Sequence, residues 1–298
     1  MRISGVYPPI VTPFDDQGRL DSEAFVANIT AWNETGLDGY VVAGSNGESV
    51  LLEPEEIVEL TRLARRAAAP GKMVITGTGC QSTSATIRLS QAAADAGADA
   101  VLVMTPSFFE AQMTDEALVR HYAAVADASP APVLLYNVPK FTHLSISAEA
   151  VLRLAKHENI IGIKDSSGNI TLLNDLLRLL PRTFDVLMGN AAIYLSALLM
   201  GATGGVLALA NVAPRECVAI RHLVVNQGRY AEAQEIHFRM APVARAITTT
   251  YGVPGLKAAL DMLGYRGGLP RPPLMPVSDS ARAAIRQTLI QAGLLAQS

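Results

Sequence analysis

The stretch GADAVLVMTP, residues 97–106, decides the fold, because it joins a helix stop directly to a buried strand. Glycine adopts the left-handed conformation that ends many helices. The run AVLVM that follows, residues 100–104, is apolar throughout, as in a strand covered on both faces. Similar stretches begin at Gly36 (GLDGYVVAG) and Gly201 (GATGGVLAL), each after a segment with helical spacing of apolar residues. This alternation predicts a parallel sheet covered by helices.

Working outward from these stretches, the pattern gives eight strands and eight helices. The strands are expected at about 5–11, 39–43, 73–76, 100–104, 133–136, 160–164, 185–188 and 205–207. The helices are expected at about 22–34, 55–68, 83–96, 114–128, 148–156, 172–180, 191–200 and 214–225. Eight βα units of this total length predict an α/β fold, a (β/α)8 TIM barrel. A doubly wound open sheet is the alternative, but it usually has fewer strands and needs a switch point.

The strand signal ends at Gly228, and three helices are expected after it, at 229–250, 254–263 and 278–295. We therefore expect a barrel catalytic domain over residues 1–225 and a C-terminal three-helix extension over residues 226–298.

The composition excludes several classes of function. The chain has 298 residues and a formal net charge of -3 without a basic cluster, so nucleic-acid binding is not expected. It lacks both a signal-peptide pattern and the run of roughly 18 apolar residues that a membrane span needs, so we expect a cytoplasmic protein without a membrane partner. Two cysteines and five scattered histidines show no metal-ligand spacing, and no GxGxxG, GxxxxGK[ST] or GxSxG motif occurs. Neither a metal nor an organic cofactor is expected.

Lys164 is the first candidate for catalysis, because it ends an apolar strand on the side of the barrel where active sites lie. Its structural alternative is a salt bridge, or a stem that reaches solvent. In an apolar mouth, however, a lysine amine can attack a ketone and form a Schiff base. The protonated imine then acts as an electron sink for breaking or making a nearby carbon–carbon bond.

Other polar groups follow neighbouring strands. Tyr136 ends the preceding strand and could shuttle a proton to the reacting bond, or it could be an ordinary core tyrosine. The turn GSNGE, residues 44–48, offers Ser45, Asn46 and backbone N–H groups to the carboxylate of a 2-oxo acid. A purely structural turn, anchored through Glu48, stays open. Three further residues near strand ends are assigned to substrate binding: Thr12, Gly189 and Val206.

The motifs together resemble those of the dihydrodipicolinate synthase / N-acetylneuraminate lyase family of class I aldolases. The resemblance covers essentially the whole chain in order: YPPIVTPF (7–14), GSNGE (44–48), GADAVLVMTP (97–106), LYNVP (135–139), IIGIKDSSGN (160–169) and ALANVAP (208–214). It implies that Lys164 is the Schiff-base lysine, that Tyr136 shuttles the proton, and that Ser45 and Asn46 bind the carboxylate and relay protons. It also implies a homotetramer built as a dimer of dimers, acting on a small 2-oxo acid.

Four departures from the synthase pattern bear on the substrate. Phe141 stands where synthases place an arginine that holds the second carboxylate, and Lys140 beside it is expected to point elsewhere from a strand-like loop. The turn carries Ser45 and Asn46 instead of two threonines. Pro54 and Ile57 replace the histidines of lysine-sensing enzymes. Phe108 and Phe109 occupy the stretch where the family often has a tyrosine that reaches the partner's site.

Among subgroups, the 4-hydroxy-2-oxoglutarate aldolases are the most similar, through GSNGE, GTGCQST (77–83), TPSFF (105–109), ALANV (208–212) and YGVPGLK (251–257). That likeness adds Ser166 to the substrate-binding residues. The leading hypothesis is cleavage of 4-hydroxy-2-oxoglutarate to pyruvate and glyoxylate. The alternatives are dihydrodipicolinate (4-hydroxy-tetrahydrodipicolinate) synthase, a 2-keto-3-deoxy sugar-acid aldolase or dehydratase, and a non-catalytic 2-oxo-acid-binding protein.

Overall fold

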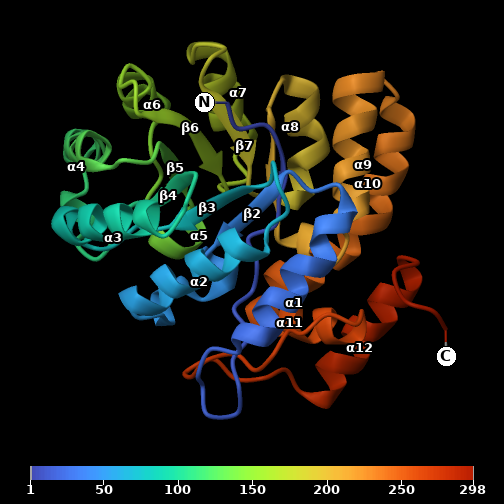
Figure 1. The fold of residues 1–298 in the computed structure, drawn as a ribbon. Helices are drawn as coiled ribbons and strands as arrows, with labels where there is room; N and C mark the ends of the chain where they lie inside the picture. The colour runs from blue at the N-terminus through green and yellow to red at the C-terminus, as the bar shows by residue number, and fades with distance from the viewer. Residues whose placement is uncertain (1, 298) are drawn as a thin grey trace.

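The computed structural model describes residues 2–297, and its eight parallel strands surround a central core (Figure 1). The strands are β1 (Gly5–Tyr7), β2 (Gly39–Val42), β3 (Met73–Gly77), β4 (Ala100–Met104), β5 (Val133–Asn137), β6 (Ile160–Asp165), β7 (Asp185–Met188) and β8 (Gly204–Val206). They are hydrogen-bonded in the order β1-β8-β7-β6-β5-β4-β3-β2. The gap between β1 and β2 is closed by a parallel bridge between Pro9 and Val41, in which the Val41 N–H donates to the Pro8 carbonyl at 2.9 Å. The predicted (β/α)8 barrel is confirmed.

Helices cover the outside of the barrel and continue beyond it. The helices are α1 (Ser22–Trp32), α2 (Pro54–Ala67), α3 (Thr83–Asp95), α4 (Asp115–Ala128), α5 (Pro139–Thr142), α6 (Ala148–Leu154), α7 (Ile170–Leu179), α8 (Tyr194–Met200), α9 (Pro214–Arg221), α10 (Tyr230–Arg245), α11 (Gly252–Met262) and α12 (Asp279–Gln291). Short side chains cap many of them; Ser82, for example, accepts the N–H of Ala85 at the start of α3. The sequence missed one helix, α5, which begins at Pro139, a residue suited to the first helical position.

Two apolar layers hold the barrel together. The inner layer fills the barrel with side chains from the strands, including Tyr7, Val41, Ile75, Leu102, Leu134, Tyr136 and Leu187. The outer layer lies between strands and helices and continues into α11 and α12 through Leu256, Leu260, Ile285 and Leu289. The predicted C-terminal helices are confirmed, and they share the core of the barrel.

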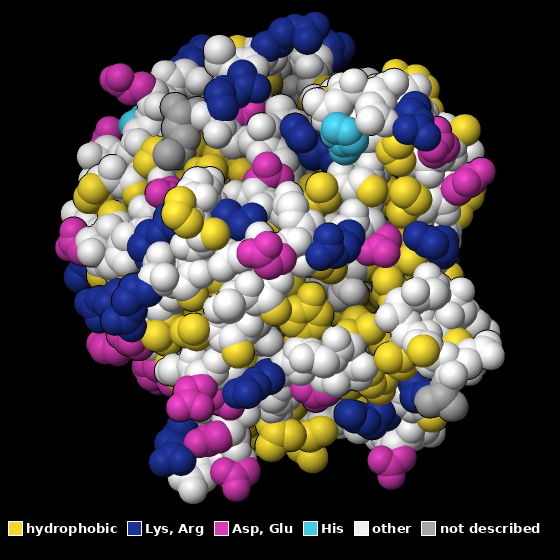
Figure 2. Space-filling view, turned by 45° about the vertical axis from the view of Figure 1, so that its right-hand side comes forward, with side chains coloured by type: hydrophobic (Ala, Val, Ile, Leu, Met, Phe, Trp, Pro, Cys, Tyr) yellow, Lys and Arg dark blue, Asp and Glu magenta, His cyan; other side chains and the backbone are white. Residues whose placement is uncertain are grey.

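The C-terminal helices return to the start of the chain. In Figure 1, α1, α11 and α12 lie in the same part of the molecule. The side-chain amide of Asn28 on α1 donates to the Arg266 carbonyl at 2.8 Å, and its oxygen accepts the Arg266 N–H at 2.8 Å. No helix within residues 2–297 combines the length and hydropathy needed to cross a bilayer. On the face seen in Figure 2, basic and acidic side chains are interspersed, and neither sign forms a continuous area.

One strand differs clearly from its prediction. β1 ends at Tyr7, whereas the sequence pattern suggested that it continues to residue 11. Pro8 and Pro9 lack the N–H groups that a strand needs for its ladder, so only an isolated bridge follows. The other strands end within one residue of their predicted positions, and the polar groups that follow them meet at one mouth.

Candidate active site

Lys164 lies in β6 directly opposite Tyr136 of β5 in the parallel register. Its side chain is buried, and its Nζ sits 3.8 Å from the centre of the Tyr136 ring. Within residues 2–297 we find no hydrogen bond and no ion pair for this amine. No contact with an acceptor therefore has to be broken before the nitrogen attacks a carbonyl carbon. The salt-bridge alternative for Lys164 is wrong.

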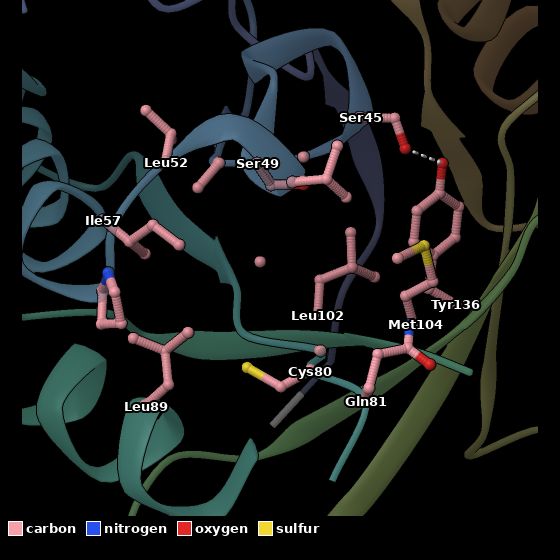
Figure 3. A pocket seen from close by; sticks show the side chains of 16 residues that line it. Ser45, Ser49, Leu52, Ile57, Cys80, Gln81, Leu89, Leu102, Met104 and Tyr136 are labelled. Carbon is pink, nitrogen blue, oxygen red and sulfur yellow. Dashed lines mark hydrogen bonds between the residues drawn. The ribbon is translucent and has the colours of Figure 1, made fainter. Parts of the chain in front are cut away.

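Tyr136 links this amine to the glycine-rich turn. Its hydroxyl lies 3.2 Å from the Ser45 hydroxyl, and either oxygen can be the donor. Figure 3 shows the two hydroxyl groups facing each other at one end of a cavity. The pair can pass a proton between the reacting region beside Lys164 and the turn.

The turn itself is a short 3-10 helix, η2 (Ser45–Gly47). The Gly44 carbonyl accepts the Gly47 N–H at 3.0 Å, and Glu48 follows in the left-handed conformation. No protein acceptor is found within residues 2–297 for the N–H groups of Ser45 and Asn46, which begin the helix. Two free N–H groups beside a hydroxyl and an amide form a suitable cradle for a carboxylate.

A cavity of about 150 Å³ brings most of the predicted residues together. Its lining includes Ser45, Asn46, Tyr136, Lys164, Ser166, Gly189 and Val206. Thr12 does not line it. The buried Thr12 hydroxyl instead donates to the Gly47 carbonyl at 2.8 Å, behind the turn.

Ser166 and Gly189 are packed tightly against each other at the cavity wall. A Cβ added at Gly189 would lie 1.9 Å from the Ser166 hydroxyl oxygen, so only glycine fits there without moving the serine. The preceding residue, Asp165, accepts hydrogen bonds from Asn137 at 2.7 Å and from the Ser167 hydroxyl at 2.9 Å. Burial raises the pKa of the Asp165 carboxyl, and these hydrogen bonds oppose the shift. Asp165 therefore fixes the loop that carries Ser166.

Lys140 was expected to point away from the site, and this prediction is wrong. Because α5 forms at Pro139, Lys140 lies on a helical turn and lines the same cavity as Lys164. Its ammonium donates to the Thr248 carbonyl at 2.9 Å and lies 5.4 Å from the Phe141 ring centre. Among the described residues that line the cavity, Lys140 and Lys164 are the only charged ones.

A second cavity, of about 360 Å³, lies on the other side of the Ser45–Tyr136 pair. In Figure 3 its far end is formed by Leu52, Ile57 and Leu89, and Cys80 lies along one side. Burial raises the pKa of the Cys80 thiol, which favours the protonated form. No group of three or more His, Cys, Asp or Glu side chains suited to a metal ion occurs within residues 2–297.

The comparisons with known proteins agree with this geometry. Residues 2–292 match the model of the dihydrodipicolinate synthetase family. The 4-hydroxy-tetrahydrodipicolinate synthase of Methanothrix thermoacetophila is 38% identical over 286 residues, which cover 96% of this chain and 95% of that protein. The enzyme of that name from Rhizobium meliloti is 36% identical over 293 residues, covering 98% of this chain and 99% of that protein.

Solved structures give the same result. The dihydrodipicolinate synthase of Cyanidioschyzon merolae with lysine bound superposes with a TM-score of 0.94 at 32% identity, covering 98% of this chain and 99% of that chain. The chloride-inhibited enzyme of Acinetobacter baumannii in complex with pyruvate has a TM-score of 0.93 at 31% identity, covering 98% of this chain and all (100%) of that chain. The names of these relatives do not support the expected closest likeness to 4-hydroxy-2-oxoglutarate aldolase.

Proposed function

Because the chain belongs to the dihydrodipicolinate synthetase family and is a class I aldolase, a carbon–carbon lyase, we propose that Lys164 forms the Schiff base with the pyruvate unit of its substrate. The observation that carries this proposal is the unpaired, buried Lys164 amine 3.8 Å from the Tyr136 ring. Because this nitrogen contacts the ring face of Tyr136 and makes no hydrogen bond or ion pair in the described structure, it is available for covalent chemistry.

The reaction follows from the positions of four side chains. Lys164 attacks the C2 ketone, and loss of water gives an iminium that withdraws electrons from C3. Ser45 and Asn46, with their N–H groups, bind the C1 carboxylate. Tyr136 exchanges a proton with the oxygen on C4 and passes it to Ser45, 3.2 Å away. Cleavage leaves an aldehyde and an enamine, which takes up a proton and is hydrolysed to pyruvate; condensation runs the same steps backwards.

The aldehyde partner has two candidates. The names of the relatives favour 4-hydroxy-tetrahydrodipicolinate synthase, in which pyruvate condenses with aspartate semialdehyde, the amino-acid aldehyde that remains when pyruvate is removed from the product skeleton. Phe141 favours instead the cleavage of 4-hydroxy-2-oxoglutarate, because the aldolases of that name, which this sequence resembles, also lack the arginine that synthases place there. In both reactions the aldehyde half carries a carboxylate of its own. Lys140, whose ammonium donates to the Thr248 carbonyl at 2.9 Å, is the cation beside Lys164 in the described cavity lining that could meet this carboxylate.

Two measurements separate these candidates. Pyruvate release from 4-hydroxy-2-oxoglutarate is coupled to lactate dehydrogenase, and condensation with aspartate semialdehyde is followed by pyruvate consumption. Sugar acids of the 2-keto-3-deoxy type serve as neutral-tail controls. Fast turnover of 4-hydroxy-2-oxoglutarate, or of aspartate semialdehyde with pyruvate, assigns the partner, whereas turnover of only the sugar acids contradicts both assignments.

We also propose the homotetramer, a dimer of dimers, on family analogy. Phe108 and Phe109 support an apolar contact between subunits, since they are 81% and 65% exposed and pack edge to face at 5.1 Å. Light scattering of the eluted protein would give a mass four times that of the chain. A mass equal to the 31.5 kDa chain would contradict the proposal.

A further inference from the structure

The carboxylate-binding turn is held in an unfavourable backbone conformation. Ala43 and Glu48, which flank η2, have φ angles of 50° and 59°. Residues with a Cβ rarely occupy this left-handed region. Such conformations persist only when surrounding contacts impose them, so the contacts that hold this turn also fix Ser45.

Glu48 supplies the strongest of these contacts. Its side chain is 1% exposed, and one carboxylate oxygen pairs with the ammonium of Lys257 on α11 at 2.5 Å. The other oxygen accepts the backbone N–H of Arg271 at 2.8 Å. Both partners belong to the C-terminal region, which therefore contacts the turn directly through Glu48.

The Lys257 ammonium joins three segments of the chain. Beside its ion pair with Glu48, it donates to the Thr12 carbonyl at 2.7 Å and to the Leu269 carbonyl at 2.7 Å. The Thr12 hydroxyl in turn donates to the Gly47 carbonyl at 2.8 Å. The ammonium therefore supports the turn at two adjacent residues, Gly47 and Glu48.

Arg271 extends the same support beyond the turn. Its guanidinium forms a bidentate pair with Glu56 at 2.6 and 2.7 Å and donates to the Leu51 carbonyl at 2.8 Å. Lys257 and Arg271 both lie over the Phe14 ring, at 4.6 and 4.2 Å from its centre. The segment that follows the turn is thus fixed by the same C-terminal residues.

A buried ion pair contributes little net stability, because desolvation offsets the attraction. Burial lowers the pKa of Lys257 to about 8, and the nearby Glu48 carboxylate is the largest opposing influence. We therefore expect the Lys257–Glu48 pair to fix the geometry of the turn more than it stabilises the fold.

We propose that Lys257 is a positioning residue for the catalytic turn. Through Glu48 and Thr12, the C-terminal region holds Ser45 in hydrogen-bonding distance of Tyr136 and holds the turn's N–H groups toward the substrate carboxylate. This inference rests on the proposed function, because that function assigns the carboxylate to the turn.

The test compares Lys257→Met and Glu48→Gln with the wild-type chain. Each protein is incubated with a series of pyruvate concentrations and borohydride, and the reduced adduct on Lys164 is quantified by mass spectrometry. Arg65→Met is the matched control, since it removes another partly buried ion pair, to Asp99 at 2.9 Å, that touches neither the turn nor the cavity. Circular dichroism establishes that each variant is folded at the assay temperature.

In both turn variants we expect half of the maximal adduct to form at a pyruvate concentration about tenfold higher than in the wild type, while Lys164 is still fully modified at saturating pyruvate. In Arg65→Met we expect this half-saturating pyruvate concentration to change less than about twofold. Half-saturation within about twofold of wild type in the folded turn variants would overturn the inference. Glu48→Gln is nearly isosteric and keeps the hydrogen bonds of Lys257 to the carbonyls of Thr12 and Leu269. If Lys257→Met does not fold, the inference is therefore tested with Glu48→Gln. Absence of any adduct in the wild-type chain would refute the proposed function itself.

Discussion

The hydroxyl oxygens of Ser45 and Tyr136 lie 3.2 Å apart, although the two residues are separated by 91 positions in the chain. This contact joins the turn after β2 to the end of β5. Since the Tyr136 ring also touches the Lys164 amine, one continuous group of side chains connects the proposed nucleophile with the proposed carboxylate-binding turn.

Replacing Tyr136 by Phe should separate binding from proton transfer. The ring remains beside Lys164, so the pyruvate adduct still forms, but the proton route to Ser45 is lost. We expect kcat to fall about 100- to 1000-fold. Ser45→Ala should cost less, and the double variant should be no slower than Tyr136→Phe because both act in one route. Steady-state kinetics of all three variants measure this, and strictly additive losses would contradict a shared route.

Replacing Lys140 by Met should weaken the binding of the aldehyde half of the substrate and leave the binding of the pyruvate half unchanged. We expect KM for the better of the two candidate substrates to rise about tenfold, because the cavity loses the ammonium of Lys140. Borohydride trapping of pyruvate should be unchanged. Lys156→Met, an exposed lysine after α6, is the control. Equal KM values for Lys140→Met and wild type would exclude this role.

Gly189→Ala should displace Ser166. The new methyl group would lie 1.9 Å from the serine hydroxyl oxygen and 3.2 Å from the Asp165 carbonyl. We expect kcat/KM to fall about tenfold or more. Adding Ser166→Gly removes the first of these clashes, so the double variant should fold as stably as Ser166→Gly alone. Thermal unfolding of the single and double variants checks this, and a double variant as unstable as Gly189→Ala would show that the clash lies elsewhere.

His121 should make the fold sensitive to mild acid. Burial lowers the pKa of this imidazole to about 4, and the Thr83 hydroxyl lies 2.9 Å from its Nδ1. Between about pH 6.5 and 4 the unfolded chain binds a proton at His121 that the folded chain does not, so the free energy of unfolding falls as the pH drops through this range. The full effect is about 3 kcal/mol.

The matched variant His121→Asn keeps a hydrogen-bonding partner for Thr83 but cannot titrate. Urea unfolding of both proteins at pH 7 and pH 4.5 isolates the contribution of the histidine. The wild type should lose more stability than the variant between the two pH values. Parallel losses would show that the buried imidazole does not control acid stability.

The barrel was predictable because its signals are local. Glycines such as Gly36 and Gly97 end helices in the left-handed conformation, and the apolar run after each is a strand buried on both faces. The positions of Lys164 and Tyr136 follow from the same pattern, since adjacent parallel strands end at one mouth.

Other parts of the site depend on contacts that no local pattern contains. Arg271 and Glu48 are 223 positions apart, so their hydrogen bond cannot be read from spacing. Thr12 follows the end of β1, and its hydroxyl faces the back of the turn because Gly47 approaches it closely. Lys140 was misplaced because the sequence suggests a strand-like loop there, whereas Pro139 starts α5.

The most direct test of the central claim is to reduce the wild-type protein with borohydride in the presence of pyruvate and map the modified residue by peptide mass spectrometry. The account predicts one reduced pyruvyl group per chain, located on Lys164, and none on a Lys164→Arg variant. An unmodified chain, or an adduct on Lys140 or Lys257 in place of Lys164, would contradict it.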